Sequence, residues 1–200
     1  VRSIRTHARV MGALGFTNEA LSGVRRAAQM DPISIVTLEA QAHEELQARQ
    51  FERALATAKR ILDLDARDPR GFEQSVASAA FLGRYPDCLT GAAEGMRIAG
   101  RAAPFLALDT YCLARAGRQT EAITRIGELD TIAKSVYVSP FLQAVAAVGL
   151  GRLERAIEHL ERGFRSHDIH MVEIRMSPWL DPIRGTPRVQ KILRDMRFPE

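Results

Sequence analysis

The side chains that could ligate a metal gather near the C-terminal end of the chain. Two imidazoles and two carboxylates, which divalent transition metals accept as ligands, occur together at His167, Asp168, His170 and Glu173. Their spacing does not place them on one face of a helix, and no second cluster completes a coordination shell. We therefore predict no metal site.

Motifs for catalysis are missing as well. The segment His43-Glu44-Glu45 lacks the second histidine of a zinc protease helix. No glycine-rich phosphate-binding loop, Gly-x-Ser-x-Gly elbow or Cys-x-x-Cys pair occurs in the sequence. The sequence predicts a protein that is not an enzyme and holds no cofactor.

Two cysteines, Cys88 and Cys112, are too few for a disulfide framework and suit a reducing compartment. We expect a cytoplasmic protein in which Cys88 is a buried packing residue. The sequence leaves a Cys88–Cys112 bridge open, although a cytosolic setting argues against it. The chain begins at Val1 rather than at methionine, so we expect a piece of a longer protein.

Composition excludes two classes of partner. The 28 basic residues exceed the 24 acidic ones by a small margin that is spread along the chain, which does not indicate direct nucleic-acid binding. The most apolar window, Phe141 to Leu150, is about half as long as a membrane-spanning helix requires. We predict no membrane partner and no secretion signal.

Any binding residue must be positioned by a repeat of 34 residues. Equivalent positions, 34 residues apart, form a lattice along the chain. At one lattice position glycine occurs in four of the five repeats, at Gly15, Gly83, Gly117 and Gly151, and Arg49 occupies the same position in the remaining repeat. A small residue lies five positions further on, and a large aliphatic residue follows it. These pairs are Ala20-Leu21, Ala54-Leu55, Cys88-Leu89, Ala122-Ile123 and Ala156-Ile157. The pattern predicts helical hairpins, in which glycine closes the first helix and the aliphatic residue joins a buried stripe on the second.

Such a 34-residue hairpin resembles the tetratricopeptide repeat family, and the resemblance covers residues 1–167. It implies an all-α fold, a right-handed α-solenoid of five helix-turn-helix repeats. The predicted repeats span about 1–34, 35–68, 69–102, 103–136 and 137–167. In the last repeat Ser139-Pro140 predicts an N-cap and first helical residue, so that helix should begin late.

Residues 168–200 form a helical tail that we expect to cap the solenoid. Thr186-Pro187 predicts a helix start, and the following apolar face would cover the last hairpin. Trp179 is expected to anchor this cap. The segments YVSPF, LGRLERAIEHLERGF and WLDPIRGTPRVQKILRDM are also similar to C-terminal repeat regions of bacterial winged-helix regulators, class III adenylate cyclases and Ser/Thr kinases. That similarity implies a sensory or recruiting module.

The family resemblance places the first helix of each repeat on a concave, ligand-binding wall. The candidate binding residues on it are Arg2, Arg5, Arg9, Glu39, His43, Arg70, Glu73, Gln74, Phe81, Leu108, Tyr111, Arg115 and Phe141. Arginine forks match carboxylates, so an acidic or C-terminal peptide is the natural partner for Arg5, Arg9 and Arg70. Solvated charges are the competing interpretation for the arginines of the first helix.

The apolar end of the wall is open to three interpretations: a hydrophobic peptide, a homodimer partner, or the Trp179-containing tail folded back into it. We predict a non-catalytic protein- or peptide-binding scaffold of a bacterial signalling or regulatory protein. The alternative is a homodimerisation module that assembles an attached output domain.

Overall fold

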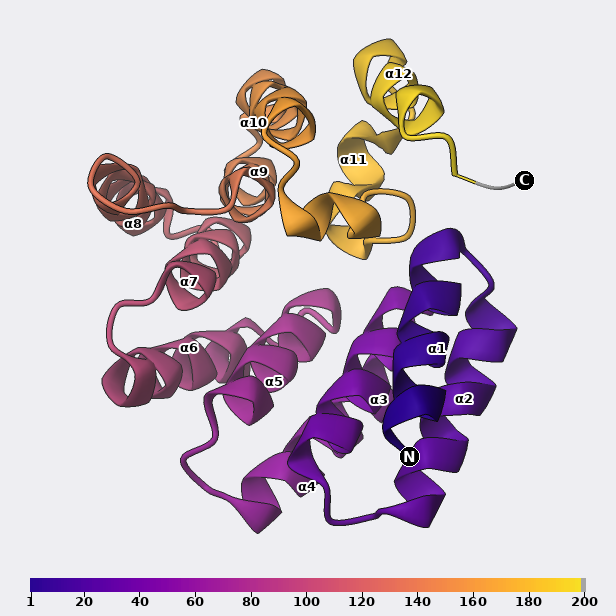
Figure 1. Cartoon of the computed structure of the whole chain (residues 1–200). Helices are drawn as coiled ribbons and strands as arrows, with labels where there is room; N and C mark the ends of the chain where they lie inside the picture. The colour runs from indigo at the N-terminus through magenta and orange to yellow at the C-terminus, as the bar shows by residue number, and fades with distance from the viewer. Residues whose placement is uncertain (199–200) are drawn as a thin grey trace. The chain divides into compact units, whose positions relative to one another are not determined.

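The computed structural model describes residues 1–198, and every regular element in that range is a helix, which confirms the all-α fold class. Five successive pairs of α-helices account for most of the chain (Figure 1). The first helices are α1 (Arg2–Leu14), α3 (Ile35–Gln47), α5 (Pro69–Phe81), α7 (Ala103–Arg115) and α9 (Pro140–Gly149). The second helices are α2 (Thr17–Met30), α4 (Phe51–Leu64), α6 (Tyr85–Ala99), α8 (Gln119–Ile132) and α10 (Leu153–Arg165).

The turn between the two helices of each pair follows the glycine lattice. Gly15, Gly83, Gly117 and Gly151 all have φ between 70° and 92°, the left-handed conformation that glycine adopts without steric cost. Arg49 takes the same conformation, with φ of 59°, although it carries a side chain. The turn geometry therefore repeats every 34 residues, whatever residue occupies the slot.

The small slot of the second helix is buried in every pair, from Ala20 to Ala156. The large slot is less uniform: Leu21, Leu55 and Ile157 are buried and Leu89 is half-buried, but Ile123 is 49% exposed. The expected buried stripe is therefore wrong at Ile123. The cause lies in the next helix: within the preceding pair, α9 packs mainly against α7 and leaves α8 largely uncovered.

The chain divides into two compact units, residues 1–98 and residues 99–200. In the first unit α3 packs on α2 and α5 packs on α4, so that each first helix covers the preceding second helix. Ala8, Val24 and Ala40 form one part of its core, while Ala28, Leu38 and Ile61 form another. Alanine is frequent at these contacts because closely packed helices leave little room for larger side chains.

In the second unit α9 begins at Pro140 with Ser139 as its N-cap residue, which confirms the predicted late start. A Cβ added at Gly149 would lie 2.6 Å from the Cα of Tyr111, so α9 needs this glycine to approach α7. The tail continues through two 3-10 helices, η1 (Ile169–Glu173) and η2 (Pro178–Leu180), into α11 (Asp181–Arg184) and α12 (Pro187–Asp195).

Helix α12 begins where Thr186-Pro187 predicts it, and its buried face includes Val189 and Ile192. It packs on α10, and Arg188 reaches Glu161 at 2.7 Å and Glu154 at 2.8 Å. The last two residues of the predicted tail, Pro199 and Glu200, lie outside the described residues. Over residues 1–198, none of the helices has the length and apolar character needed to span a bilayer.

Candidate functional site

The predicted binding wall is distributed over both units. Helices α1, α3 and α5 of the first unit carry the polar members, and Phe81 lies at the end of α5. Helices α7 and α9 of the second unit carry Leu108, Tyr111, Arg115 and Phe141. The side chains of the two parts differ in burial and in their hydrogen-bond and ion-pair partners.

Helix α1 presents arginines near the end where a helix normally carries acidic residues. Its first turn has no acidic residue, and Arg2 and Arg5 lie close to the positive end of the helix dipole. Neither side chain has a hydrogen-bond or ion-pair partner among residues 1–198. Arg9 is engaged only weakly, since its Nη1 lies 3.4 Å from Oε1 of Glu39 on α3. This part of the wall combines unpartnered positive charge with exposed or half-buried side chains.

A buried polar network behind the wall holds α3 in place. Glu45 is 2% exposed and accepts hydrogen bonds from Gln41 Nε2 at 2.9 Å and from Thr57 Oγ1 at 2.7 Å. Arg25 of α2 lies 4.0 Å from Glu45 and donates to Gln50 at 2.7 Å. Sequence reasoning missed this network, although Leu38, Gln41 and Glu45 share the spacing of one helical face. The network orients α3 and with it the half-buried Glu39 and His43.

Arg70 is less available than the sequence suggests. Its Nη2 lies 2.5 Å from Oδ2 of Asp68, and its Nε donates to Oδ1 of the same carboxylate at 3.0 Å. Asp68 also accepts the backbone N–H of Arg70 at 2.8 Å and so caps α5. The hydrogen bond from the Arg70 side chain holds the pKa of Asp68 below its ordinary value. The guanidinium of Arg70 therefore binds the carboxylate that caps α5 and is already engaged on the wall.

The remaining predicted residues of α5 are partly covered. Glu73 is half-buried, Gln74 is buried, and the half-buried Phe81 stacks on Phe51 of α4 with ring centroids 4.8 Å apart. This stacking joins the end of α5 to the start of α4, the preceding second helix. Among the predicted polar residues of the first-unit wall, the exposed ones are Arg2 and Arg9 of α1 and the Asp68-bound Arg70 of α5.

The tail covers the apolar wall of the second unit. Leu108 and Phe141 are 6% and 3% exposed. Trp179 meets Tyr111 edge to face with ring centroids 4.8 Å apart, and His170 stacks on Phe141 at 6.2 Å. Helix η2 packs against α9 while α12 packs against α10, so the tail both lines the first-helix wall and caps the last hairpin. Trp179, 7% exposed, is an anchor within this packing, and Arg115 remains exposed.

Asp168, one of the four residues weighed as metal ligands, pins the tail instead. Its buried carboxylate accepts hydrogen bonds from Tyr137 Oη at 2.5 Å, Ser139 Oγ at 3.1 Å and the His170 backbone at 3.0 Å. The hydrogen bond to Asp168 raises the pKa of Tyr137. Within residues 1–198 no three His, Cys, Asp or Glu side chains are grouped so that they could hold a metal ion.

Arg184 holds the other end of the 3-10 segment. Its guanidinium donates to the carbonyl of Ile174 at 2.6 Å and also to the carbonyls of Arg175 and Ser177. The sequence does not indicate this role of Arg184, because its acceptors are backbone carbonyls, which every residue carries. The Asp168 carboxylate and the Arg184 guanidinium thus hold the two ends of the 3-10 segment.

Comparison with solved structures identifies the architecture. A thermophilic TPR protein of Thermus thermophilus superposes with a TM-score of 0.68 over 90% of this chain and 98% of that one, at 18% sequence identity. The chain has the tetratricopeptide-repeat fold. It is also similar to YrrB, described as a TPR protein with an unusual peptide-binding site, with a TM-score of 0.52 over 86% of this chain and 89% of that one at 13% identity.

A third similar structure is the MamA protein, with a TM-score of 0.55 over 85% of this chain and 95% of that one at 12% identity. No family model and no curated protein sequence matches the chain. The similarity of the C-terminal part to winged-helix regulators, cyclases and kinases stays a prediction.

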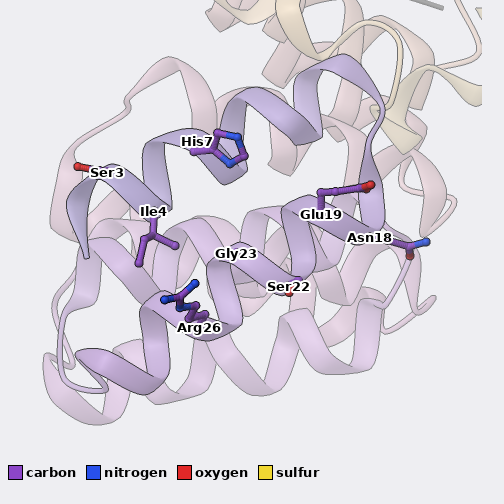
Figure 2. A pocket seen from close by; sticks show the side chains of 8 residues that line it. All are labelled: Ser3, Ile4, His7, Asn18, Glu19, Ser22, Gly23 and Arg26. Atoms are coloured by element: carbon purple, nitrogen blue, oxygen red, sulfur yellow. The ribbon is translucent and has the colours of Figure 1, made fainter.

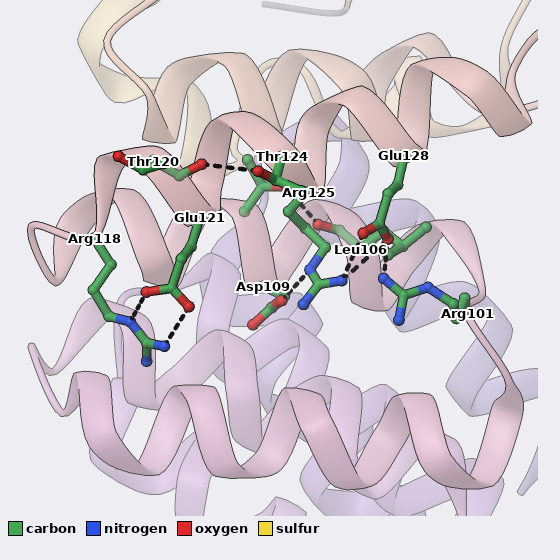
Figure 3. A network of polar contacts seen from close by, with 10 residues as sticks. Arg101, Leu106, Asp109, Arg118, Thr120, Glu121, Thr124, Arg125 and Glu128 are labelled. Carbon is green, nitrogen blue, oxygen red and sulfur yellow. Dashed lines mark hydrogen bonds and ion pairs between the residues drawn. The ribbon is translucent and has the colours of Figure 1, made fainter.

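In the second unit of this tetratricopeptide-repeat fold, a further polar cluster lies between α7 and α8 (Figure 3). Arg125 of α8 donates through Nε to the buried Asp109 of α7 at 2.6 Å and through Nη1 to Glu128 at 3.0 Å, and Arg101 also contacts Glu128. Burial raises the pKa of Asp109. An open depression of about 620 Å³ lies beside this cluster. Because these charges pair with one another, the cluster ties α7 to α8.

The two cysteines also pack inside the tetratricopeptide repeats. Cys88 fills its small slot and is fully buried, as expected from the lattice. Cys112 is equally buried, and among residues 1–198 neither cysteine is a free thiol. This differs from the expectation that a cytosolic setting keeps both reduced.

Proposed function

We propose that this protein is a non-catalytic scaffold that binds a partner protein along the first-helix wall of residues 1–98. The observation that carries the proposal is the unpartnered positive charge of Arg2 and Arg5 on α1. The partner segment is acidic, because arginine side chains bind carboxylates with charge-assisted hydrogen bonds. Arg9 joins them by exchanging its long contact with Glu39 for a ligand carboxylate.

The placement of the arginines supports a ligand rather than a structural role. Positive side chains at the positive end of a helix dipole destabilise that helix by several tenths of a kcal/mol. None of the five first helices carries an acidic residue in its first turn, but α1 places two arginines there that have no partner in the described chain, whereas Arg70 of α5 is paired with Asp68. A bound carboxylate would offset this unfavourable arrangement.

Two further observations narrow the proposal. Arg70 is held by Asp68, so the carboxylate clamp consists mainly of α1 residues. Leu108 is buried, Trp179 of the tail packs against Tyr111 and His170 of the tail stacks on Phe141, so a hydrophobic peptide would have to displace the tail. The similarity to YrrB, a TPR protein described as having a peptide-binding site, agrees with a peptide ligand.

The wider role that we propose is recruitment within a bacterial signalling or regulatory protein of the cytoplasm. It rests on the sequence similarity of residues near the C-terminus to repeat regions of such regulators. Self-association is the alternative function. The apolar wall that would serve it is buried at Leu108 and Phe141.

The test is binding of a fluorescently labelled hexaglutamate peptide with a free C-terminus, measured by anisotropy. Arg5→Glu should weaken binding by about tenfold or more, since it removes a charge-assisted hydrogen bond and adds repulsion. Lys59→Glu, an equal charge change at an exposed site on α4, is the matched control and should have little effect. Equal affinities of wild type and Arg5→Glu would overturn the proposal.

A further inference from the structure

The short helix η1 exposes apolar side chains that its own packing does not use. A 3-10 helix has three residues per turn, so residues three apart lie on the same face. Met171 and Ile174 share the inward face, where they are 3% and 0% exposed. Ile169 and Val172 share a different face, where they are 78% and 49% exposed. Two large aliphatic side chains of η1 therefore face solvent.

A second exposed apolar segment lies directly beside η1. Val136 and Tyr137, in the loop between α8 and α9, are 55% and 72% exposed. The Oη of Tyr137 donates to Oδ2 of Asp168 at 2.5 Å, and Asp168 is the residue before Ile169. This hydrogen bond fixes the phenol at the start of η1. The exposed residues Val136, Tyr137, Ile169 and Val172 are named the η1 patch below.

The repeat itself does not require an apolar residue at the most exposed position of the η1 patch. Counted along the 34-residue lattice, Ile169 corresponds to Ile33, Arg67, Arg101 and Ser135, all of which are exposed. The position therefore faces solvent throughout the chain and accepts polar residues. Single apolar residues are ordinary at a protein surface, whereas a contiguous group of them marks an interaction site.

The surroundings of the η1 patch are positively charged. Residues 131–140 and 162–172 contain the patch, and their lysine and arginine side chains are Lys134, Arg162 and Arg165. All three are exposed, and neither Lys134 nor Arg165 has a hydrogen-bond or ion-pair partner among residues 1–198. Asp168 is the only acidic residue in the two ranges, and its buried carboxylate is engaged by the loop before α9.

Neighbouring groups leave this positive charge largely uncompensated. Arg162 contacts Gln143 and His159, which are both uncharged at neutral pH because burial lowers the pKa of His159 to about 4. Glu161, just before the second range, accepts a hydrogen bond from Arg188 at 2.7 Å. Glu173, just after it, is half-buried. The η1 patch therefore has an apolar centre and a positively charged rim.

We propose that the η1 patch binds a segment of another protein that carries both carboxylates and large apolar side chains. The carboxylates complement the cations of the rim, and the apolar side chains remove the centre of the patch from water. A second copy of this chain fits less well, because it would bring like charges together. The surface lies in the second unit and does not rest on the proposed function, whose arginines lie on α1.

An anionic membrane surface is the competing occupant. Basic clusters that bind anionic lipids hold roughly four to eight lysines and arginines. The rim of the η1 patch has three. The hydroxyl of Tyr137 is also held by Asp168, so its ring presents a fixed shape, which favours a partner of defined structure. A protein segment therefore suits this patch better than a lipid surface.

The test compares two fluorescently labelled peptides with blocked ends, EELEELEE and EEAEEAEE, by anisotropy with the full chain. Both carry the same charge, so any attraction to the arginines of α1 is the same for both. The wild type should bind the leucine peptide about tenfold more tightly, because leucine side chains become buried against the patch. Ile169→Ser should bring the two affinities together. Ile33→Ser is the matched control, since Ile33 is 73% exposed at the corresponding lattice position, and should keep the difference.

The charge of the rim is tested separately. Arg165→Glu should weaken binding of the leucine peptide by about tenfold, since it removes an attraction and adds a repulsion. Arg26→Glu is the control for this exchange, because Arg26 is an exposed arginine on α2 in the first unit (Figure 2). It should change the affinity for the leucine peptide much less.

Three outcomes would overturn the proposal. The first is equal affinity of the wild type for the two peptides, and the second is a tenfold difference that persists in Ile169→Ser. The third is that the wild type, but not Ile169→Ser, sediments with phosphatidylserine vesicles while the two peptides bind equally, which would assign the patch to a membrane. Circular dichroism of each variant confirms that it is folded before its affinities are compared.

Discussion

At the scale of the residue, the same side chain has opposite effects at different lattice positions. Gly151 has φ of 70° and Gly127 lies inside α8, and a Cβ at either site would meet nothing within 4 Å. Alanine at either position would therefore cause no steric clash, and only the backbone conformation makes its effect on stability different at the two positions. Alanine is strained in the left-handed region but is favoured over glycine inside a helix.

We expect Gly151→Ala to lower the free energy of unfolding by about 1 kcal/mol and Gly127→Ala to raise it by up to about 1 kcal/mol. Urea denaturation of the two variants beside the wild type measures both effects. A Gly151→Ala variant as stable as the wild type would show that the turn position does not require its left-handed conformation.

A second residue-scale effect concerns His159 of α10. Burial, followed by the nearby Arg162 and Arg155, lowers the pKa of His159 from 6.5 to about 4. The folded state therefore keeps the imidazole neutral, while the unfolded chain takes up a proton as pH falls below 6.5. The contribution of neutral His159 to stability is complete above pH 6.5 and is lost between pH 6.5 and 4.

His159→Gln should remove this part of the acid sensitivity. Between pH 7 and pH 4.5 the wild type should lose about 2 kcal/mol more unfolding free energy than the variant does. Urea denaturation at the two pH values gives the difference for each protein. Parallel pH dependences would contradict the assignment to His159.

At the scale of the element, the register of one helix decides how the last repeats pack. Helix α9 begins at Pro140 and lies mainly on α7, whereas α3 and α5 lie on the second helices that precede them. Ile123 is left exposed as a consequence, and the first-helix wall of the second unit is covered by η2. The tail is therefore part of the packing of this unit.

Trp179→Ala tests that packing. Loss of the buried indole should cost about 3–5 kcal/mol of unfolding free energy, lower the melting temperature and increase binding of an apolar dye to the uncovered wall. Ile169→Ala is the control, since Ile169 lies in the same tail with 78% of its surface exposed. A melting temperature equal to that of the control would show that the tail is not held through Trp179.

At the scale of the whole molecule, positive charge is concentrated at the beginning of the chain. Residues 1–34 hold five arginines against two acidic residues, which favours acidic partners. Raising the salt concentration should therefore weaken binding of the hexaglutamate peptide, because salt screens the attraction between exposed charges. Fluorescence anisotropy at low and high salt measures the two affinities, and an unchanged affinity would contradict an electrostatic contact.

The repeat could be predicted from the sequence because each lattice position has the same local structural role in every hairpin. A left-handed turn, a small contact residue and a helix start at Ser139-Pro140 or Thr186-Pro187 depend on neighbours within a few residues. Residue type and spacing therefore predict them. Even Arg49 follows the lattice, since the surrounding helices impose the turn.

The state of the binding wall was decided only by the tertiary structure. Arg70 and Arg2 occupy the same position of the 34-residue repeat, yet Asp68 engages Arg70 and nothing in the described chain engages Arg2. Asp168 became an anchor for Tyr137 and Ser139, residues about thirty positions away. Such contacts depend on which groups packing brings together, and a helical period carries no information about partners that are distant in the chain.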